Sequence, residues 1–240
     1  MSRIIKVYLK NVFNQRGFYI CLVVTVAINL VIPFIMGLFI ESGANTTISN
    51  EIVTLLSSGI GIIETIFITI FVCSDFSEGA TKNFIARGYT RRQILTSKFF
   101  VSLIATLVFL LANILGIFVF YGKNGIGFNS SIIIYIIGAL AALVANVGLY
   151  VVISNTVEKL GIAIAINLIL PNVLDLLFPI INMVTKSNIN FSNFWISRLI
   201  GLMSKTPTVN EMLSVVALSF VYLVILFEIS NFIIKKKEVK

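Results

Sequence analysis

Histidine is absent from this chain of 240 residues, and cysteine occurs only twice. The chain therefore lacks the side chain that most often serves as a general acid or base and as a metal ligand. No histidine is available to activate a serine or cysteine nucleophile, and no H-E-x-x-H run is present. We expect no catalytic residue, no metal site and no cofactor held by the chain itself.

A loop that could bind the phosphates of a nucleotide is missing as well. Gly122 and Lys123 come nearest to G-x-x-x-x-G-K-[ST], but both the upstream glycine and the following hydroxyl residue are absent. We therefore expect that any ATP and Mg²⁺ used by the protein would be bound by a partner.

Acidic residues are scarce. The chain has 10 aspartates and glutamates against 18 lysines and arginines, a formal net charge of +8, and 58% of its residues are hydrophobic. With a mean hydropathy of +1.03, so much apolar surface could not be buried in a soluble core, and a bilayer must be the solvent. In a membrane protein this charge indicates orientation and contact with lipid headgroups, not nucleic-acid binding.

Six apolar segments reach the length of about 20 residues that a membrane helix needs. They predict an all-α integral membrane protein, a single domain over residues 1–240 with six transmembrane helices. Most lysines and arginines then fall on the side of the N-terminus, which predicts both termini in the cytoplasm. The predicted spans are Phe18–Ile40, Ile52–Ser74, Phe99–Tyr121, Ile132–Ser154, Leu160–Met183 and Met212–Ile234.

Cys21 and Cys73 lie near the cytoplasmic side, which is reducing, so we expect buried thiols and no disulfide.

Two further segments are amphipathic. Residues 2–17 carry apolar side chains at helical spacing, among them Tyr8 and Val12, and predict a helix that lies in the membrane interface. A cleaved signal peptide is the competing interpretation, but the apolar run that follows is too long and no A-x-A site follows it. Residues 184–211, the longest outer loop, predict a short surface helix with Trp195 at headgroup depth.

Residues 75–92 form a polar hairpin between the second and third predicted spans. Asp75 followed by Glu78 is typical of a helix start, and Gly88 is typical of a left-handed helix end. Thr90 with Gln93 indicates that a second helix begins there through a capping box. The hairpin therefore predicts a short helix outside the hydrocarbon, suited to docking a soluble partner. An ordinary cytoplasmic loop whose charge only sets topology is the alternative.

Acidic side chains also fall inside the predicted spans. Glu64 lies near the middle of the second span, and Asp175 lies in the fifth between Pro171 and Pro179, which predict a broken helix there. Charged groups at such depths are costly, so they face protein or water. These four residues are candidates for a pathway or a gate. The alternative is that the acids hydrogen-bond to neighbours and hold helices together. Glu228, near the inner end of the sixth span, could reach the interface.

At the hairpin the chain resembles the membrane subunit of type-2 ABC exporters of the bacteriocin-immunity and peptide-efflux type. The matching stretches are Asp75-Phe76-x-x-Gly79-x-x-Lys82-Asn83, Arg87-Gly88-x-x-Arg91 and Lys98, and the layout of an amphipathic helix and six spans matches too. Gly79-Ala80-Thr81 departs from the family pattern, in which threonine more often follows the glycine directly. This departure leaves the role of Thr81 open.

The resemblance implies a permease subunit in the bacterial plasma membrane that dimerises with a like or unlike permease. Two separately encoded ATPases would dock on the hairpins, and ATP would drive a hydrophobic or amphipathic peptide, or a lipid-like substrate, outward. A proton-coupled carrier that uses Glu64 without an ATPase and a membrane immunity protein that transports nothing are the alternatives. The residues expected to couple to the ATPase are Glu78, Gly79, Lys82, Phe84, Ile85, Arg87, Gly88 and Arg91.

Overall fold

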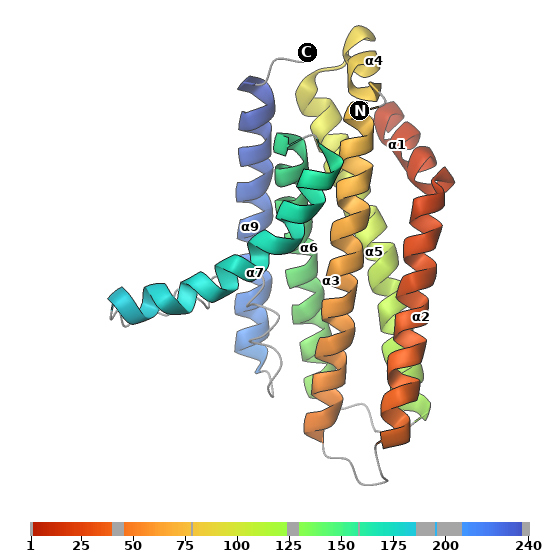
Figure 1. The fold of residues 1–240 in the computed structure, drawn as a ribbon, viewed down its shortest axis with the longest axis vertical. Coiled ribbons are helices and arrows are strands. Elements are labelled where there is room, and N and C mark those ends of the chain that lie inside the picture. Colours follow the sequence, from red (N-terminus) through yellow and green to blue (C-terminus); the bar gives the residue numbers. More distant parts are fainter. Residues whose placement is uncertain are drawn as a thin grey trace.

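The computed structural model describes residues 2–39, 46–77, 79–123, 130–157, 159–185, 195 and 208–236. Within these ranges the chain is helical and has no strand. The long helices run lengthwise as a bundle, except for part of α7, and the first, short helix is inclined to them (Figure 1). In chain order they are α1 (Ser2–Asn14), α2 (Arg16–Phe39), α3 (Thr46–Ser77), α4 (Ala80–Ala86), α5 (Arg91–Lys123), α6 (Ser130–Val157), α7 (Leu160–Thr185) and α9 (Val209–Lys236).

Four helices of the described residues are long and apolar enough to cross a membrane: Arg91–Leu115, Leu140–Val157, Leu160–Thr185 and Val209–Lys235. A fifth crossing is added if Arg3–Asn14 and Arg16–Ile28, which meet at 61°, are taken as one bent span. The protein is therefore an all-helical chain with the character of a membrane protein. Each predicted span coincides closely with one helix, but the full set of six crossings stays a prediction.

Aromatic rings join the first helices at the centre of the bundle. The ring of Phe18 in α2 lies 5.5 Å from that of Phe67 in α3 and 5.4 Å from that of Phe109 in α5. The rings of Phe67 and Phe109 are 5.3 Å apart. All three side chains are buried, and such ring pairs add to the stability gained from burial alone. Residues far apart in sequence thus fix α2, α3 and α5 against one another.

Helix α1 is amphipathic as predicted, but its apolar face packs on protein. Ile4, Tyr8 and Val12 are buried at the spacing of successive helical turns, while Arg3, Lys6 and Lys10 are exposed. The buried side chains belong to the same hydrophobic cluster as residues of α3 and α5. This helix therefore covers one end of the bundle and leaves its cations outside.

Helices α6 and α9 form the most extensive helix pair of the described structure. Gly148 permits this close packing, because a Cβ atom at that position would lie 3.2 Å from side-chain atoms of Leu226. By contrast, α5 packs on α1, α2, α3 and α6 and touches α9 less than any of these four.

Helix α7 differs from what its prolines predict. Pro171 and Pro179 lie inside one helix that continues from Leu160 to Thr185, so the predicted break in the fifth span is wrong. Proline removes one backbone hydrogen bond but can remain in a helix that bends. The first part of α7 packs on α3 and α6, and the rest leads away from the bundle (Figure 1). Most of its exposed side chains there are apolar, for example Leu176 at 71% and Met183 at 81%.

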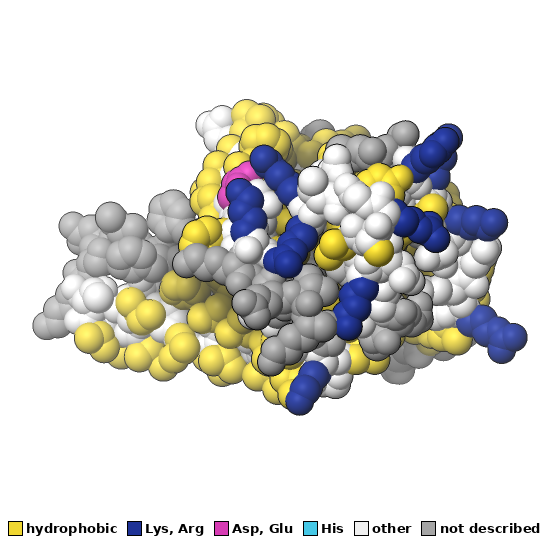
Figure 2. Space-filling model, turned by 90° about the horizontal axis from the view of Figure 1, so that it is seen from above, with side chains coloured by type: hydrophobic (Ala, Val, Ile, Leu, Met, Phe, Trp, Pro, Cys, Tyr) yellow, Lys and Arg dark blue, Asp and Glu magenta, His cyan; other side chains and the backbone are white. Residues whose placement is uncertain are grey.

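The start of α1, the helix α4 and the end of α9 lie at one end of the molecule, which we call the hairpin end (Figure 1). Seen from that end, lysine and arginine side chains spread over the face, with little acidic surface among the described residues (Figure 2). The exposed cations near this end are Arg3, Lys6, Lys10, Lys82, Arg87, Arg92, Lys159 and Lys235.

Candidate functional site: the hairpin and the buried polar groups

The turn that ends α4 is built by Gly88. Its φ of 84° is left-handed, which glycine adopts at little cost. The N–H of Gly88 donates to the carbonyl of Ile85 at 2.9 Å, and the N–H of Tyr89 donates to that of Phe84 at 3.2 Å. This pair of bonds is the Schellman arrangement that terminates helices. The predicted helix end at Gly88 is confirmed.

The start of α5 is also as predicted. The N–H of Thr90 donates to Oε1 of Gln93 at 3.0 Å, and the N–H of Gln93 donates to Oγ1 of Thr90 at 3.3 Å. These reciprocal bonds form a capping box, which satisfies N–H groups that the helix leaves free. The hairpin thus enters α5 through a defined geometry.

The predicted helix start at Asp75 is wrong. Helix α3 continues through Ser77, and Gly79, with a left-handed φ of 69°, precedes α4 without a side-chain cap. Asp75 therefore lies in the last turns of α3, where its side chain is free for tertiary contacts. Glu78, the proposed capping partner and ATPase contact, lies outside the described residues.

The carboxylate of Asp75 instead forms a buried ionic cluster with Tyr8, Thr81 and Lys98. Its Oδ2 pairs with Nζ of Lys98 and accepts hydrogen bonds from the hydroxyls of Tyr8 at 2.8 Å and Thr81 at 2.9 Å. The side chains of Lys98 and Asp75 are only 2% and 6% exposed. The four residues come from α1, α3, α4 and α5, so one carboxylate connects four helices directly beneath the hairpin.

Further contacts satisfy the buried charge of Lys98. Its Nζ donates to Oγ1 of Thr81 at 3.3 Å and lies 4.2 Å from the ring centre of Phe76, a favourable cation–π distance. Burial and the neighbouring Asp75 carboxylate raise the pKa of the Tyr8 hydroxyl above its ordinary value, so this group acts as a neutral donor. A buried ion pair is stable only with this degree of hydrogen bonding.

The apolar face of α4 points into the protein. Phe84 is buried, and its ring lies 5.3 Å from that of Tyr8 and 6.1 Å from that of Tyr89. Ala80 and Ile85 pack against the same cluster. Phe84 therefore fixes the hairpin to its own bundle, with half-buried Ile85 beside it. That the two residues anchor a partner stays a prediction. Outward surface is provided by Lys82, Asn83, Ala86 and Arg87, all exposed.

The two arginines that open α5 contact α9. Nη1 of Arg91 donates to the carbonyl oxygen of Ile234 at 3.3 Å. Nη2 of Arg92 lies 3.8 Å from Oε1 of Glu228, and both side chains are more than half exposed. Arg91, predicted to couple to a partner, is thus half-buried between α5 and the end of α9.

Glu64 is fully buried in α3. Its Oε1 accepts a hydrogen bond of 2.8 Å from the hydroxyl of Thr106 in α5, and its side chain has no exposed surface. Such a contact holds two helices together. The contact with Thr106 fits a structural role, whereas the second carboxyl oxygen, Oε2, is buried without a hydrogen-bond partner among the described residues.

A second polar contact set joins α3, α6 and α7. Nδ2 of Asn167 donates to Oγ1 of Thr69 at 2.8 Å and to Oγ of Ser154 at 3.1 Å. The thiol of the buried Cys73 lies 3.8 Å from the carbonyl oxygen of Ser154, in keeping with the predicted buried thiol. Asn167 was not predicted as a site residue, because an asparagine in an apolar run carries no signal about its partners.

The candidate gate residues lie on two helices, Glu64 on α3 and the other three on α7. Asp175 is half-buried on α7, and Pro171 and Pro179 lie on the same continuous helix, far along the chain from Glu64. Trp195 is buried and packs on Phe178 with 5.6 Å between ring centres, so it does not lie on the surface as expected. The remainder of the predicted outer helix lies outside the described residues.

Comparison with protein-family models and with curated proteins gives no match. Among the described residues, no three acidic or cysteine side chains are grouped so that they could hold a metal ion. The hairpin residues and their contacts therefore provide the basis for a proposed function.

Proposed function

We propose that this chain is the permease subunit of an ATP-driven exporter and that residues 75–92 transmit the movement of a separate ATPase. The observation that supports it best is the ionic cluster beneath the hairpin. Because Asp75 contacts residues of α1, α4 and α5 at once, a force on α4 would reach three neighbouring helices. An ordinary loop needs no such buried connection.

The outward face of the hairpin has the chemistry of a docking surface. Lys82 and Arg87 are exposed on either side of Asn83 and Ala86, and helix α4, which ends at Arg87, fixes their spacing. Charged groups at the edge of an interface steer association and select the partner. We infer that the ATPase presents acidic groups to this face and that Phe84 supports the hairpin from below.

The bundle also leaves apolar surface for a second permease subunit. The far part of α7 exposes large apolar side chains, such as Leu176 and Met183. In a bilayer this surface can meet lipid or another subunit. The substrate we propose is a hydrophobic or amphipathic peptide that leaves from the bacterial plasma membrane, with both termini of the chain in the cytoplasm.

The experiment is co-purification of the tagged chain with candidate ATPases encoded beside it, followed by ATP-dependent efflux. Arg87→Glu should weaken binding by about tenfold or more, since like charges across an interface cost several kcal/mol. Lys159→Glu is the matched control, because Lys159 is an exposed cation outside the hairpin. If Arg87→Glu and Lys159→Glu behave alike in binding and efflux, the hairpin is not the docking element.

A further inference from the structure

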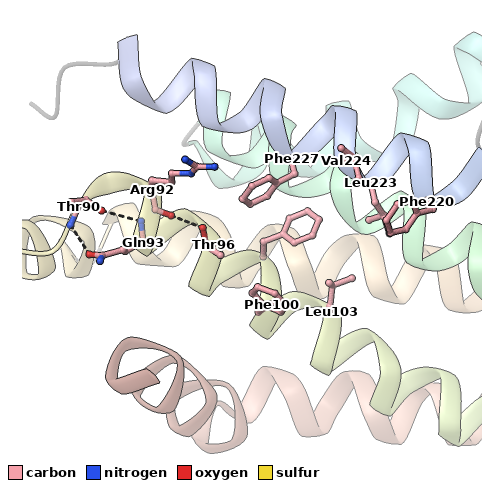
Figure 3. Close-up of a pocket in the computed structure, with 11 residues that line it drawn as sticks. Thr90, Arg92, Gln93, Thr96, Phe100, Leu103, Phe220, Leu223, Val224 and Phe227 are labelled. Atoms are coloured by element: carbon pink, nitrogen blue, oxygen red, sulfur yellow. Dashed lines mark hydrogen bonds between the residues drawn. The ribbon is translucent and has the colours of Figure 1, made fainter. Parts of the chain in front are cut away.

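A groove of about 730 Å³ lies between α5 and α9, near the hairpin end (Figure 3). Both of its walls are helices with the length and hydropathy of a membrane span. Side chains of both walls are exposed along it, among them Phe100 at 48% and Phe220 at 67%. The groove is lined by Thr90, Arg92, Gln93, Thr96, Phe99, Phe100, Leu103, Phe220, Leu223, Val224 and Phe227.

The polarity of the groove changes along its length. Its end beside the hairpin is lined by Thr90, Arg92, Gln93 and Thr96, and the rest of the lining is aromatic and aliphatic. Phe99 and Phe227 meet across it with 5.3 Å between ring centres. From Thr90 to Leu103 the helix rises by about 20 Å, compared with roughly 15 Å of hydrocarbon in one leaflet. The groove therefore has the length and the polarity of one lipid.

Arg92 is the charged group at the polar end. The hydroxyl of Thr96 donates to the carbonyl of Arg92, and Thr90 and Gln93 are occupied by the capping box. The guanidinium of Arg92 meets Glu228 only at 3.8 Å with both side chains exposed, a weak type of pair. Of its five N–H donors, several remain for another acceptor, and arginine matches phosphate geometry well.

We propose that this groove binds one anionic phospholipid from the leaflet at the hairpin end. The headgroup phosphate would lie at Arg92, and an acyl chain would lie between Phe99, Phe100 and Phe220. Charge complementarity supports this occupant, since the surrounding end of the molecule is rich in cations (Figure 2) and such clusters attract anionic headgroups. The carboxylate of Glu228, 3.8 Å from Arg92, would repel the phosphate. Replacing Glu228 by a neutral residue should therefore strengthen binding.

The test needs only this chain, so it is independent of the proposed transport function. The chain is purified in a neutral detergent and titrated with phosphatidylglycerol or with phosphatidylcholine of the same acyl chains, and bound lipid is counted by native mass spectrometry. We expect one tightly bound phosphatidylglycerol, preferred over phosphatidylcholine by about fivefold, the effect of one cation near an anionic headgroup. Arg92→Gln should remove this preference, and Glu228→Gln should increase it.

Two further variants separate the groove from general surface charge. Lys159→Gln removes an exposed cation away from the groove and should leave the preference unchanged. Val224→Trp places a large side chain in the groove and should reduce the binding of both lipids. The proposal is overturned if Arg92→Gln keeps the preference or if Lys159→Gln loses as much. It is also overturned if Val224→Trp abolishes a dimer in the same spectra while lipid binding is unchanged, because the occupant would then be a second copy.

Discussion

At the scale of single residues, the pairing of Asp75 with Lys98 is the feature that sequence reasoning could not supply. Both residues were visible as parts of a motif, but the hydrogen bond from Tyr8 to Asp75 joins residues 67 positions apart. Such contacts are fixed by how helices pack, which local patterns do not encode. The capping box of Thr90 and Gln93 was predictable because its partners are only 3 positions apart.

Lys98→Met is expected to destabilise the protein strongly. The change leaves Asp75 buried without its cation, and breaking one side of a buried ion pair costs about 3–5 kcal/mol. Unfolding in mixtures of sodium dodecyl sulfate and a mild detergent measures this loss. Lys82→Met, at an exposed position of α4, should change stability by less than about 0.5 kcal/mol. Equal effects of the two variants would contradict the role of the ionic cluster.

Glu64→Gln is expected to keep both the fold and partner-driven efflux. The glutamine carbonyl can accept the same hydrogen bond from Thr106, so the link between α3 and α5 is retained. Transport is measured in liposomes with and without the ATPase. Loss of a flux driven by a pH gradient in liposomes that lack any ATPase would favour the proton-coupled carrier instead.

At the scale of elements, the end of the hairpin was predicted correctly, whereas its start and the course of α7 were not. Glycine at a helix end has a local cause, a positive φ, and Gly88 shows it. Proline tends to break a helix, but packing around it can override this tendency. Helix α7 therefore continues through Pro171 and Pro179. The inward direction of Phe84 also depends on neighbours, since an apolar stripe on a short helix has the same pattern whether it meets its own bundle or a partner.

Gly88→Ala is expected to loosen the hairpin without unfolding the bundle. A Cβ at Gly88 would meet nothing within 4 Å, so the cost is only that of a left-handed backbone, about 1 kcal/mol. Hydrogen exchange of the amides of α4 should become about fivefold faster. Gly17→Ala, also in open space but inside α2, should be neutral or slightly stabilising. An unchanged exchange rate in Gly88→Ala would show that the turn is not held by this glycine.

At the scale of the whole molecule, the position of the hairpin relative to the membrane decides the proposed function. In a chain with Cys21→Ser and Cys73→Ala, Arg87→Cys and Lys159→Cys should react with a membrane-impermeant maleimide only after cells are opened. Thr46→Cys, at the far end of α3 (Figure 1), should react in intact cells. Labelling of Arg87→Cys in intact cells would place the hairpin outside and exclude docking of a cytoplasmic ATPase.

The packing of the whole bundle is uneven in a way that has a mechanical consequence. Helix α9 is held along α6, with Leu226 close to Gly148, whereas α5 packs on α1, α2, α3 and α6. Because α5 touches α9 less than it touches α6, a tilt of α9 about its contact with α6 would break few contacts with α5. The side of α9 that faces α5 is therefore the one most easily opened, and it begins where the hairpin passes into α5.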